Sequence, residues 1–418
     1  MSTSSDAQAL HALARAGADR VIAMTQAMVR CDSQTPPSDT RAIVDLVAGW
    51  LSEMPGVTLT RHISEHPVEN LVARLDGGLP GKRLILNGHL DTYPIGQETD
   101  WTQDPLGGTI IDGKLYGRGS ADMKGANAAL IECMRIFAEH LRPFPGEIVL
   151  VLGGDEERMG ELGVQWLIDH VPEVRGDGVL VADVGGLHAT RLGEKGMLWL
   201  ALEATGHQAH GAHVHAGENA VDKLIDALID LRHLETLTPD PAKDALAVIE
   251  AAAAMQGADG PVPRATMQRV TVNLGQIEGG TSPNLVPARA RAGLDIRIPL
   301  GLSAKSVQQA AGDLLKDHPS VRWTTERLYE PTWTDASAPI AQACKDAAEY
   351  VLGTQTWVDM RIGGSDARLW RRAGFETVVL GLTPYNLGAP DEYLMTDELG
   401  PLTAIYVFSA QRFLGISS

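Results

Sequence analysis

Several short apolar segments of this chain end directly in clusters of polar residues, and this repeated pattern strongly limits the folds that it can adopt. Helical patterns separate the apolar segments. Apolar strands that alternate with helices are typical of a mainly parallel sheet covered by helices, in which ligands bind at the carboxyl ends of the strands. We therefore predict that the polar clusters converge on one site. The segments and the residues that follow them are Leu84–Leu86 with Asn-Gly-His-Leu-Asp at 87–91, Ile148–Leu152 with Gly-Gly-Asp-Glu-Glu at 153–157, and Val179–Ala182 with Asp183.

The pattern of predicted strands and helices changes after about residue 194. Strand and helix patterns there follow the order β-α-β-β-α-β, which predicts a compact α+β unit. Residues 238–264 are rich in Ala, Pro and Gly, and we expect a long loop for them. We thus predict an α/β catalytic domain in two pieces, residues 1–193 and 331–418, with a smaller α+β domain, residues 194–330, inserted between them.

The composition narrows the classes of function. The chain has 35 basic and 53 acidic side chains, a net charge of −18, which disfavours binding to nucleic acid or to anionic membranes. Its three cysteines are widely spaced, which argues against a disulfide framework and fits a reducing compartment. No apolar run approaches the roughly 20 residues that span a bilayer, and the first residues lack the apolar core of a signal peptide. We expect a soluble cytoplasmic protein.

The acidic and histidine residues at the strand ends are the candidates for chemistry. Each one alone has an ordinary structural interpretation: a histidine packed in the core, an aspartate in a glycine-rich turn, or glutamates on the surface. Together they favour a metal centre, because one imidazole with several carboxylates suits zinc or manganese. These residues are His89, Asp91, Asp122, Glu156, Glu157 and Asp183.

The whole set of motifs resembles a metallohydrolase family that includes aminoacylase, glutamate carboxypeptidase and succinyl-diaminopimelate desuccinylase. The resemblance spans nearly the whole chain, and it implies a zinc-exopeptidase-like catalytic domain with an inserted ferredoxin-like dimerisation domain. The matching motifs are Asn87–Asp91, Gly117–Gly125, Gly154–Glu157, Gly279–Asn284 with Pro287, Gly363–Arg368 and Pro390–Tyr393.

The resemblance implies roles for the metal ligands. Asp122 would bridge two divalent metals, manganese or zinc, and His89 and Asp183 would complete the first site. Glu157 would hold the second metal together with a histidine just before residues 390–393. Because this chain lacks the histidine that the resemblance implies, we expect one metal per chain, with two as the alternative.

The resemblance also implies the groups that act beside the metal. Glu156 would be the general base that takes a proton from water and passes it to the leaving nitrogen. Asp91 would orient the ring of His89. His210 matches a position that reaches the active site of the partner subunit in a homodimer, where it would stabilise negative charge that develops on oxygen.

Four further residues are candidate contacts to the carboxylate of a small substrate. Arginine can bind a carboxylate through two hydrogen bonds, although surface salt bridges explain the two arginines equally well. A separate metal site is the less favoured interpretation of the histidines at 207, 210, 213 and 215. The candidate substrate contacts are Asn284, Arg297, Arg368 and Tyr385.

The chain departs from its family at Gly388, which stands where the resemblance implies the histidine of the second metal. The last histidine of the chain is His318, so no shift of alignment supplies one. Tyr385 or another group would have to replace it. Three interpretations follow: a mononuclear site, a dinuclear site with a weak second metal, or an inactive relative.

The missing histidine motivates our first hypothesis, an aminohydrolase that releases ammonia from an electron-poor aromatic amine such as 5-nitroanthranilate. Ring substituents would absorb negative charge there, which reduces the need for a second metal. The alternative is the ordinary activity of the family, amide hydrolysis of N-acyl amino acids or small peptides. A non-catalytic protein that kept the fold is the third hypothesis. The aminohydrolase and the amide hydrolase hypotheses both involve hydrolysis of a C–N bond in a small molecule that carries a carboxylate.

Overall fold

The computed structural model describes residues 3–256 and 261–416, which divide into two compact units. Unit 1 comprises Met1–Leu192, Thr334–Asp359 and Ser365–Ser418, and unit 2 comprises Gly193–Trp333 and Met360–Gly364. Across these described residues, no helix is both long enough and apolar enough to cross a membrane.

The main sheet has a parallel centre and antiparallel edges. Strands β6, β3, β7 and β15 run parallel to one another, whereas β1, β2, β8 and β13 join by antiparallel pairing. The prediction of a mainly parallel sheet is confirmed. Within the described residues it has nine strands: β1 (Val57–Glu65), β2 (Val68–Asp76), β6 (Phe144–Gly153), β3 (Gly78–His89), β7 (Gly178–Val181), β15 (Thr377–Val379), β8 (Ala189–Glu194) and β13 (Thr332–Trp333) in this order, with β14 (Trp357–Arg361) paired to β8.

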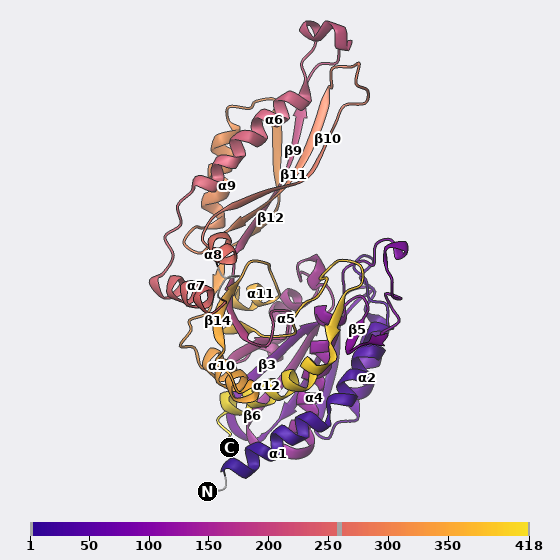
Figure 1. Cartoon of the computed structure of the whole chain (residues 1–418), viewed down its shortest axis with the longest axis vertical. Helices are drawn as coiled ribbons and strands as arrows, with labels where there is room; N and C mark the ends of the chain where they lie inside the picture. Colours follow the sequence, from indigo (N-terminus) through magenta and orange to yellow (C-terminus); the bar gives the residue numbers. More distant parts are fainter. Residues whose placement is uncertain (1–2, 257–260, 417–418) are drawn as a thin grey trace. The chain divides into compact units, whose positions relative to one another are not determined.

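Helices cover both faces of the sheet, which explains why its central strands read as continuous apolar runs. Alternate side chains such as Ile85 and Val149 join a buried cluster with residues of α5 and α11. Helices α4 and α12 pack against β3 and β6, as Figure 1 shows, and against each other. The helices of unit 1 are α1 (Thr3–Ala16), α2 (Ala18–Val29), α3 (Arg41–Ser52), α4 (Gly125–Ile136), α5 (Val164–His170), α10 (Pro339–Leu352), α11 (Ala367–Arg372) and α12 (Thr396–Leu414).

The carboxyl ends of the central strands meet at one edge of the sheet. His89, the last residue of β3, lies opposite Gly153, the last residue of β6, and Asn87 lies opposite Val181, the last residue of β7. The polar residues that follow these strands therefore begin side by side. A small sheet of β4 (Ile110–Ile111), β5 (Lys114–Tyr116) and β16 (Tyr393–Met395) joins the segment near Asp122 to the late part of the chain.

Unit 2 contains the predicted β-α-β-β-α-β order in one antiparallel sheet. Helices α6 and α9 pack on this sheet through a shared apolar core. The side chain of Asn219 accepts hydrogen bonds from the N–H groups of Val221 and Asp222, which caps the start of α6. The strands lie in the order β10 (Thr271–Gly279), β11 (Arg289–Ile298), β9 (Gly196–Thr205) and β12 (Val321–Tyr329), and the helices are α6 (Ala220–Leu231) and α9 (Ala304–Leu315).

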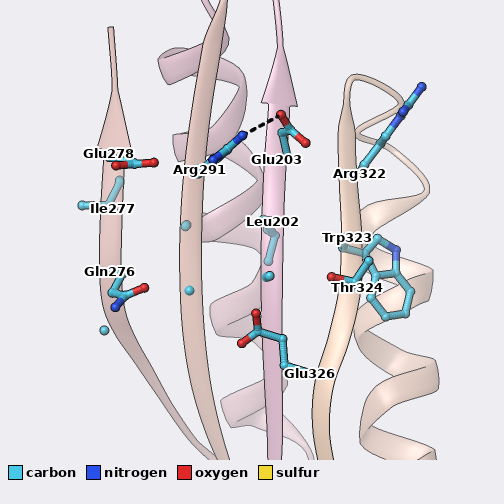
Figure 2. A pocket seen from close by; sticks show the side chains of 14 residues that line it. Leu202, Glu203, Gln276, Ile277, Glu278, Arg291, Arg322, Trp323, Thr324 and Glu326 are labelled. Carbon is cyan, nitrogen blue, oxygen red and sulfur yellow. Dashed lines mark ion pairs between the residues drawn. The ribbon is translucent and has the colours of Figure 1, made fainter. Parts of the chain in front are cut away.

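The other face of this sheet carries mainly polar side chains, as Figure 2 shows. Glu203 of β9 and Arg291 of β11 form an ion pair of 3.6 Å across neighbouring strands. Glu326 of β12 lines the same hollow. Alternation of apolar and polar residues is the pattern expected of an antiparallel sheet with one solvated face.

The loop expected for residues 238–264 is wrong, because two helices occupy much of it. They are α7 (Lys243–Met255) and α8 (Pro261–Met267), and residues 257–260 lie outside the described part. Alanine has the highest helix propensity, and Ala245, Ile249 and Ala252 form a buried stripe at helical spacing. Counting Ala together with Pro and Gly concealed this pattern.

Candidate active site

His89 is fixed at the end of β3 by a close approach between the strand and α4. The amide of Asn127 in α4 donates a 2.6 Å hydrogen bond to the backbone oxygen of His89. A Cβ atom at Gly88 would lie 2.0 Å from the Asn127 side-chain oxygen, so the glycine permits this contact. The backbone around His89 is therefore held on the sheet independently of its ring.

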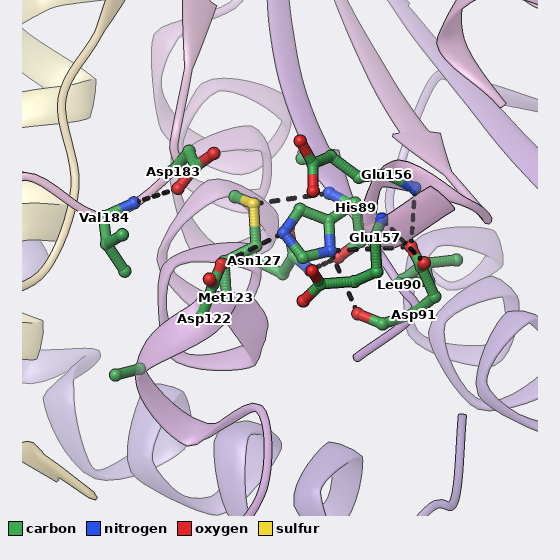
Figure 3. A network of polar contacts seen from close by, with 12 residues as sticks. His89, Leu90, Asp91, Asp122, Met123, Asn127, Glu156, Glu157, Asp183 and Val184 are labelled. Carbon is green, nitrogen blue, oxygen red and sulfur yellow. Dashed lines mark hydrogen bonds and ion pairs between the residues drawn. The ribbon is translucent and has the colours of Figure 1, made fainter. Parts of the chain in front are cut away.

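The structure brings together the three residues predicted for the first metal site (Figure 3). His89 Nε2 lies 3.1 Å from Asp122 Oδ1, and ligand atoms of His89, Asp122 and Asp183 all lie within 4.8 Å of one another. All three side chains are buried. Burial opposes charge on the His89 ring, but hydrogen bonds to Asp122 and Asp91 outweigh it and raise the pKa of the ring well above its usual value. One imidazole and two buried carboxylates fit a divalent metal.

Asp122 is positioned by a residue from the far end of the chain. The Glu392 carboxylate accepts hydrogen bonds from the N–H groups of Ala121 (3.2 Å) and Asp122 (3.3 Å). Glu392 is itself paired with the buried guanidinium of Arg118. The motifs at residues 117–125 and 390–393 are thus joined next to Asp122.

Asp91 holds two parts of the site at once. Its carboxylate accepts hydrogen bonds from the N–H groups of Glu156 (3.0 Å) and Glu157 (3.1 Å) and from the hydroxyl of Thr35. His89 Nδ1 lies 3.0 Å from the backbone oxygen of Asp91 and 3.6 Å from its carboxylate. Contact with the His89 ring, which the sequence predicted, is therefore made chiefly through the backbone oxygen.

Glu156 and Glu157 lie beside the same histidine, and ligand atoms of His89, Glu156 and Glu157 form a second group within 4.8 Å. Burial raises the pKa of Glu156 to about 7. Burial and the nearby Asp122 carboxylate raise the pKa of Glu157 well above its usual value. Oε1 of Glu157 is buried and has no hydrogen-bond partner among the described residues. A cation beside it would satisfy this oxygen and reduce the repulsion between the carboxylates.

Arg368 lies against the proposed base. Its guanidinium is 3.5 Å from Glu156 Oε1, and it donates hydrogen bonds to the backbone oxygens of Ser365 and Met159. The neighbouring Asp366 has a pKa raised well above its usual value by burial and by Glu156. The predicted role of Arg368 as a substrate contact therefore competes with a role beside Glu156.

Tyr385 lies away from the predicted ligands. Its ring stacks on Tyr393 at 4.7 Å between centroids, and burial, followed by the Glu398 charge, raises the pKa of its phenol. Another tyrosine, Tyr93, is next to the site instead. Glu157 and then burial raise the pKa of the Tyr93 phenol above its usual range.

The remaining predicted residues belong to unit 2. His210 precedes a short helical turn, and its Nδ1 accepts a 3.1 Å hydrogen bond from the N–H of Ala212. Gly211 donates to the backbone oxygen of Asn284, so the two family motifs of this unit lie side by side. Arg297 is paired with Asp295 on its own strand. Within the described part of the chain, the histidines of unit 2 belong to no group of three potential metal ligands.

Sequence reasoning missed several residues that the structure places at the site. Glu392 and Arg118 were within recognised motifs but had no predicted role. Tyr93 follows the His-Leu-Asp motif by two residues, and this closeness was the only signal that could have found it. Asp366 lies in a recognised glycine-rich motif beside Arg368.

Known proteins share both the sequence pattern and the fold. Residues 85–412 match the sequence profile of peptidase family M20/M25/M40. The succinyl-diaminopimelate desuccinylase of Rhodospirillum centenum is 31% identical over 403 residues, which cover 94% of this chain and 97% of that protein. A family M20 metallo-carboxypeptidase from Sulfolobus solfataricus has the same fold, with a TM-score of 0.81, 17% identity, and coverage of 95% of this chain and 99% of that one.

A third relative bears on the metal content of the family. It is a dinuclear metal-binding M20 peptidase of Bacillus subtilis, with a TM-score of 0.67, 13% identity, and coverage of 96% of this chain and 99% of that one. The comparisons favour the amide-hydrolase alternative over the aromatic aminohydrolase, which none of these relatives specifically supports. The chain belongs to peptidase family M20/M25/M40 and is a metal-dependent hydrolase that acts on amide C–N bonds.

Proposed function

We propose that this protein hydrolyses the amide bond of an N-acyl amino acid or a small peptide that carries a carboxylate. The observation that carries the proposal is the buried group of His89, Asp122 and Asp183 with the Glu156 carboxylate beside it. A metal ligand set next to a buried carboxylate of raised pKa is the arrangement needed for hydrolysis by activated water.

The residues of the site have separate roles in metal binding and in proton transfer. His89, Asp122 and Asp183 would hold a divalent metal, which supplies polarisation of the substrate carbonyl and lowers the pKa of water. Glu156 takes the proton of the attacking water and passes it to the leaving nitrogen. Its pKa of about 7 suits both steps near neutral pH. Asp91 fixes the backbone of Glu156 and therefore the position of the base.

The relatives suggest the acyl group to test first. Several succinyl-diaminopimelate desuccinylases match more than nine-tenths of this chain, at 28 to 31% identity. We infer that an N-succinyl amino acid is a suitable first substrate, with N-acetyl amino acids and dipeptides as the next classes.

Other features stay predictions. We propose that the enzyme works in the cytoplasm as a homodimer in which His210 stabilises negative charge on the substrate oxygen. Asn284 and Arg297 are proposed to contact the substrate carboxylate. Manganese or zinc is the proposed metal.

A product assay on a panel of substrates tests the proposal. Purified enzyme with Mn²⁺ or Zn²⁺ is incubated with N-succinyl amino acids, N-acetyl amino acids, dipeptides and 5-nitroanthranilate, and free amine, acid and ammonia are measured. We expect amine and carboxylic acid in equal amounts, and loss of at least a thousandfold in rate for Glu156→Gln, on the order of general-base contributions. Glu98→Gln, an exposed glutamate of the same unit, is the matched control. Ammonia from the nitroaromatic compound without amide cleavage would overturn the proposal.

A further inference from the structure

Gly388 lacks a side chain at a place where the backbone is firmly held. Arg118 donates hydrogen bonds to the backbone oxygens of Gly388 (3.2 Å) and Ala389 (3.3 Å). Gly388 has a φ of +70°, a conformation that favours glycine. A Cβ atom at this position would lie 3.9 Å from Cδ2 of Tyr93, so a side chain there would project toward the tyrosine ring.

Tyr93 reaches the carboxylates of the site from a segment that is anchored on both sides. The N–H of Thr92 donates to the backbone oxygen of Ser33, and the N–H of Ile95 donates to the side chain of Gln34. Glu157 has the largest effect on the raised pKa of the Tyr93 phenol, followed by burial and Glu156, so the phenol lies near these carboxylates. Tyr93 therefore presents an oxygen atom beside the group predicted to hold the second metal.

Glu157 itself needs a further partner. Its Oε1 is buried without a hydrogen bond among the described residues. A buried carboxylate oxygen with no partner is costly, and a bound cation removes that cost. After burial, the Asp122 carboxylate has the largest effect on the raised pKa of Glu157, and a cation shared by the two carboxylates would relieve their repulsion.

We propose that the phenol oxygen of Tyr93 is a ligand to a second divalent metal, together with Asp122 and Glu157, and supplies the donor that Gly388 lacks. Tyr385, the tyrosine nearer in sequence to Gly388, instead stacks on Tyr393. The inference concerns metal binding, and it stands whether the substrate is an acyl amino acid or a peptide.

The chemistry of the donor atoms sets the preference of this second site. Asp122, Glu157 and Tyr93 offer only oxygen, whereas the first site includes the imidazole of His89. Oxygen donors suit Mn²⁺, and imidazole suits Zn²⁺ as well. We therefore expect the second site to bind metal more weakly than the first, with a donor set that suits Mn²⁺.

Metal titration of the metal-free full chain tests the proposal without any substrate. Bound Mn²⁺ is counted by equilibrium dialysis with elemental analysis, and electron paramagnetic resonance distinguishes isolated ions from magnetically interacting pairs. We expect two Mn²⁺ per chain in the wild type, the second weaker than the first, with a spectrum of interacting ions at full loading. Tyr93→Phe should weaken the second ion at least tenfold and leave the first unchanged.

Two variants make the result interpretable. Tyr385→Phe, which alters a tyrosine away from the ligands, should retain both ions, and Asp183→Ala should weaken the first. Circular dichroism confirms that each variant is folded, and the side chain of Tyr93 is 43% exposed, so its hydroxyl is not needed for the core. A single Mn²⁺ in the wild type over the whole titration, or two equally bound ions in Tyr93→Phe, would overturn the inference. Neither result bears on whether amides are hydrolysed.

Discussion

The guanidinium of Arg368 lies 3.5 Å from Oε1 of Glu156, and the backbone oxygens of Ser365 and Met159 hold it there. Burial raises the pKa of Glu156. The positive charge of Arg368 stabilises the ionised carboxylate and so limits this increase. We therefore propose that Arg368 helps to keep Glu156 ionised near neutral pH and is a positioning residue that acts through it.

Replacing Arg368 by Met should move the acid limb of the pH–rate profile to higher pH by on the order of one pH unit, because Glu156 loses a nearby cation. Activity below neutral pH falls most, and the rate at high pH recovers. The profile of kcat/KM against pH measures this, with the exposed Arg372→Met as the control. A rise in KM with an unchanged acid limb would instead identify Arg368 as a contact to the substrate carboxylate.

Asp91 should matter for metal binding although it is not a proposed ligand. Asp91→Ala removes the acceptor of the Glu156 and Glu157 N–H groups and the support beside the His89 ring. We expect metal affinity to fall about 10–100-fold, the usual effect of losing such a supporting group. Competition with a chromophoric chelator measures the affinity, and Asp100→Ala, an exposed aspartate, is the control. Unchanged affinity in Asp91→Ala would show that the turn holds its shape without this carboxylate.

Glu392 should be important for stability as well as for the site. Glu392→Ala removes the acceptor of Arg118 and of the N–H groups of Ala121 and Asp122, and leaves these buried donors without that partner. Breaking one side of a buried ion pair costs about 3–5 kcal/mol of unfolding free energy. Urea denaturation of the metal-free protein measures this loss, and Asp391→Asn, which alters the neighbouring half-buried aspartate, should cost much less. Equal stability of the two variants would mean that Arg118 finds another partner.

The parts of the fold that the sequence predicts are those in which burial imposes a simple pattern. The central strands β3, β6 and β7 are buried on both faces, so they read as apolar runs such as Ile148–Leu152. The edge strand β1 and its neighbour β2 were not predicted. The side chains of β1 are only partly buried or exposed, so it lacks such a run. Helix α7 was missed because its alanines were counted as part of a loop.

The candidate site also contains some residues that the local sequence pattern predicts and others that it does not. His89, Asp122 and Asp183 could be chosen because strand ends and family motifs mark them. The role of Tyr93 depends on where residues 386–392 pass, and Arg118, far away in the sequence, fixes that path. No local pattern encodes such a long-range contact. The position of Arg368 against Glu156 likewise depends on α11 packing beside β15.

Removing the metal should make the stability of the protein depend on pH. Burial raises the pKa of Glu156 from its usual 4.5 to about 7, and of Glu392 to about 7. Between these values each of the two groups binds more protons in the folded state than in the unfolded state, so its contribution to stability is fully present below about 4.5 and is lost as the pH rises through about 7. Lys195, whose pKa burial lowers to about 7, acts in the opposite direction only above that pH.

The unfolding temperature of the chelator-treated protein should therefore fall between pH 4.5 and 7, and scanning calorimetry at several pH values measures the slope. Metal should flatten it, because a cation beside Glu156 and Glu157 favours their ionised forms. Glu156→Gln should reduce the slope of the metal-free protein, since a neutral amide does not titrate. If the slope has the opposite sign, the carboxyl groups of the site are ionised in the metal-free protein, and another cation within the fold must already neutralise them.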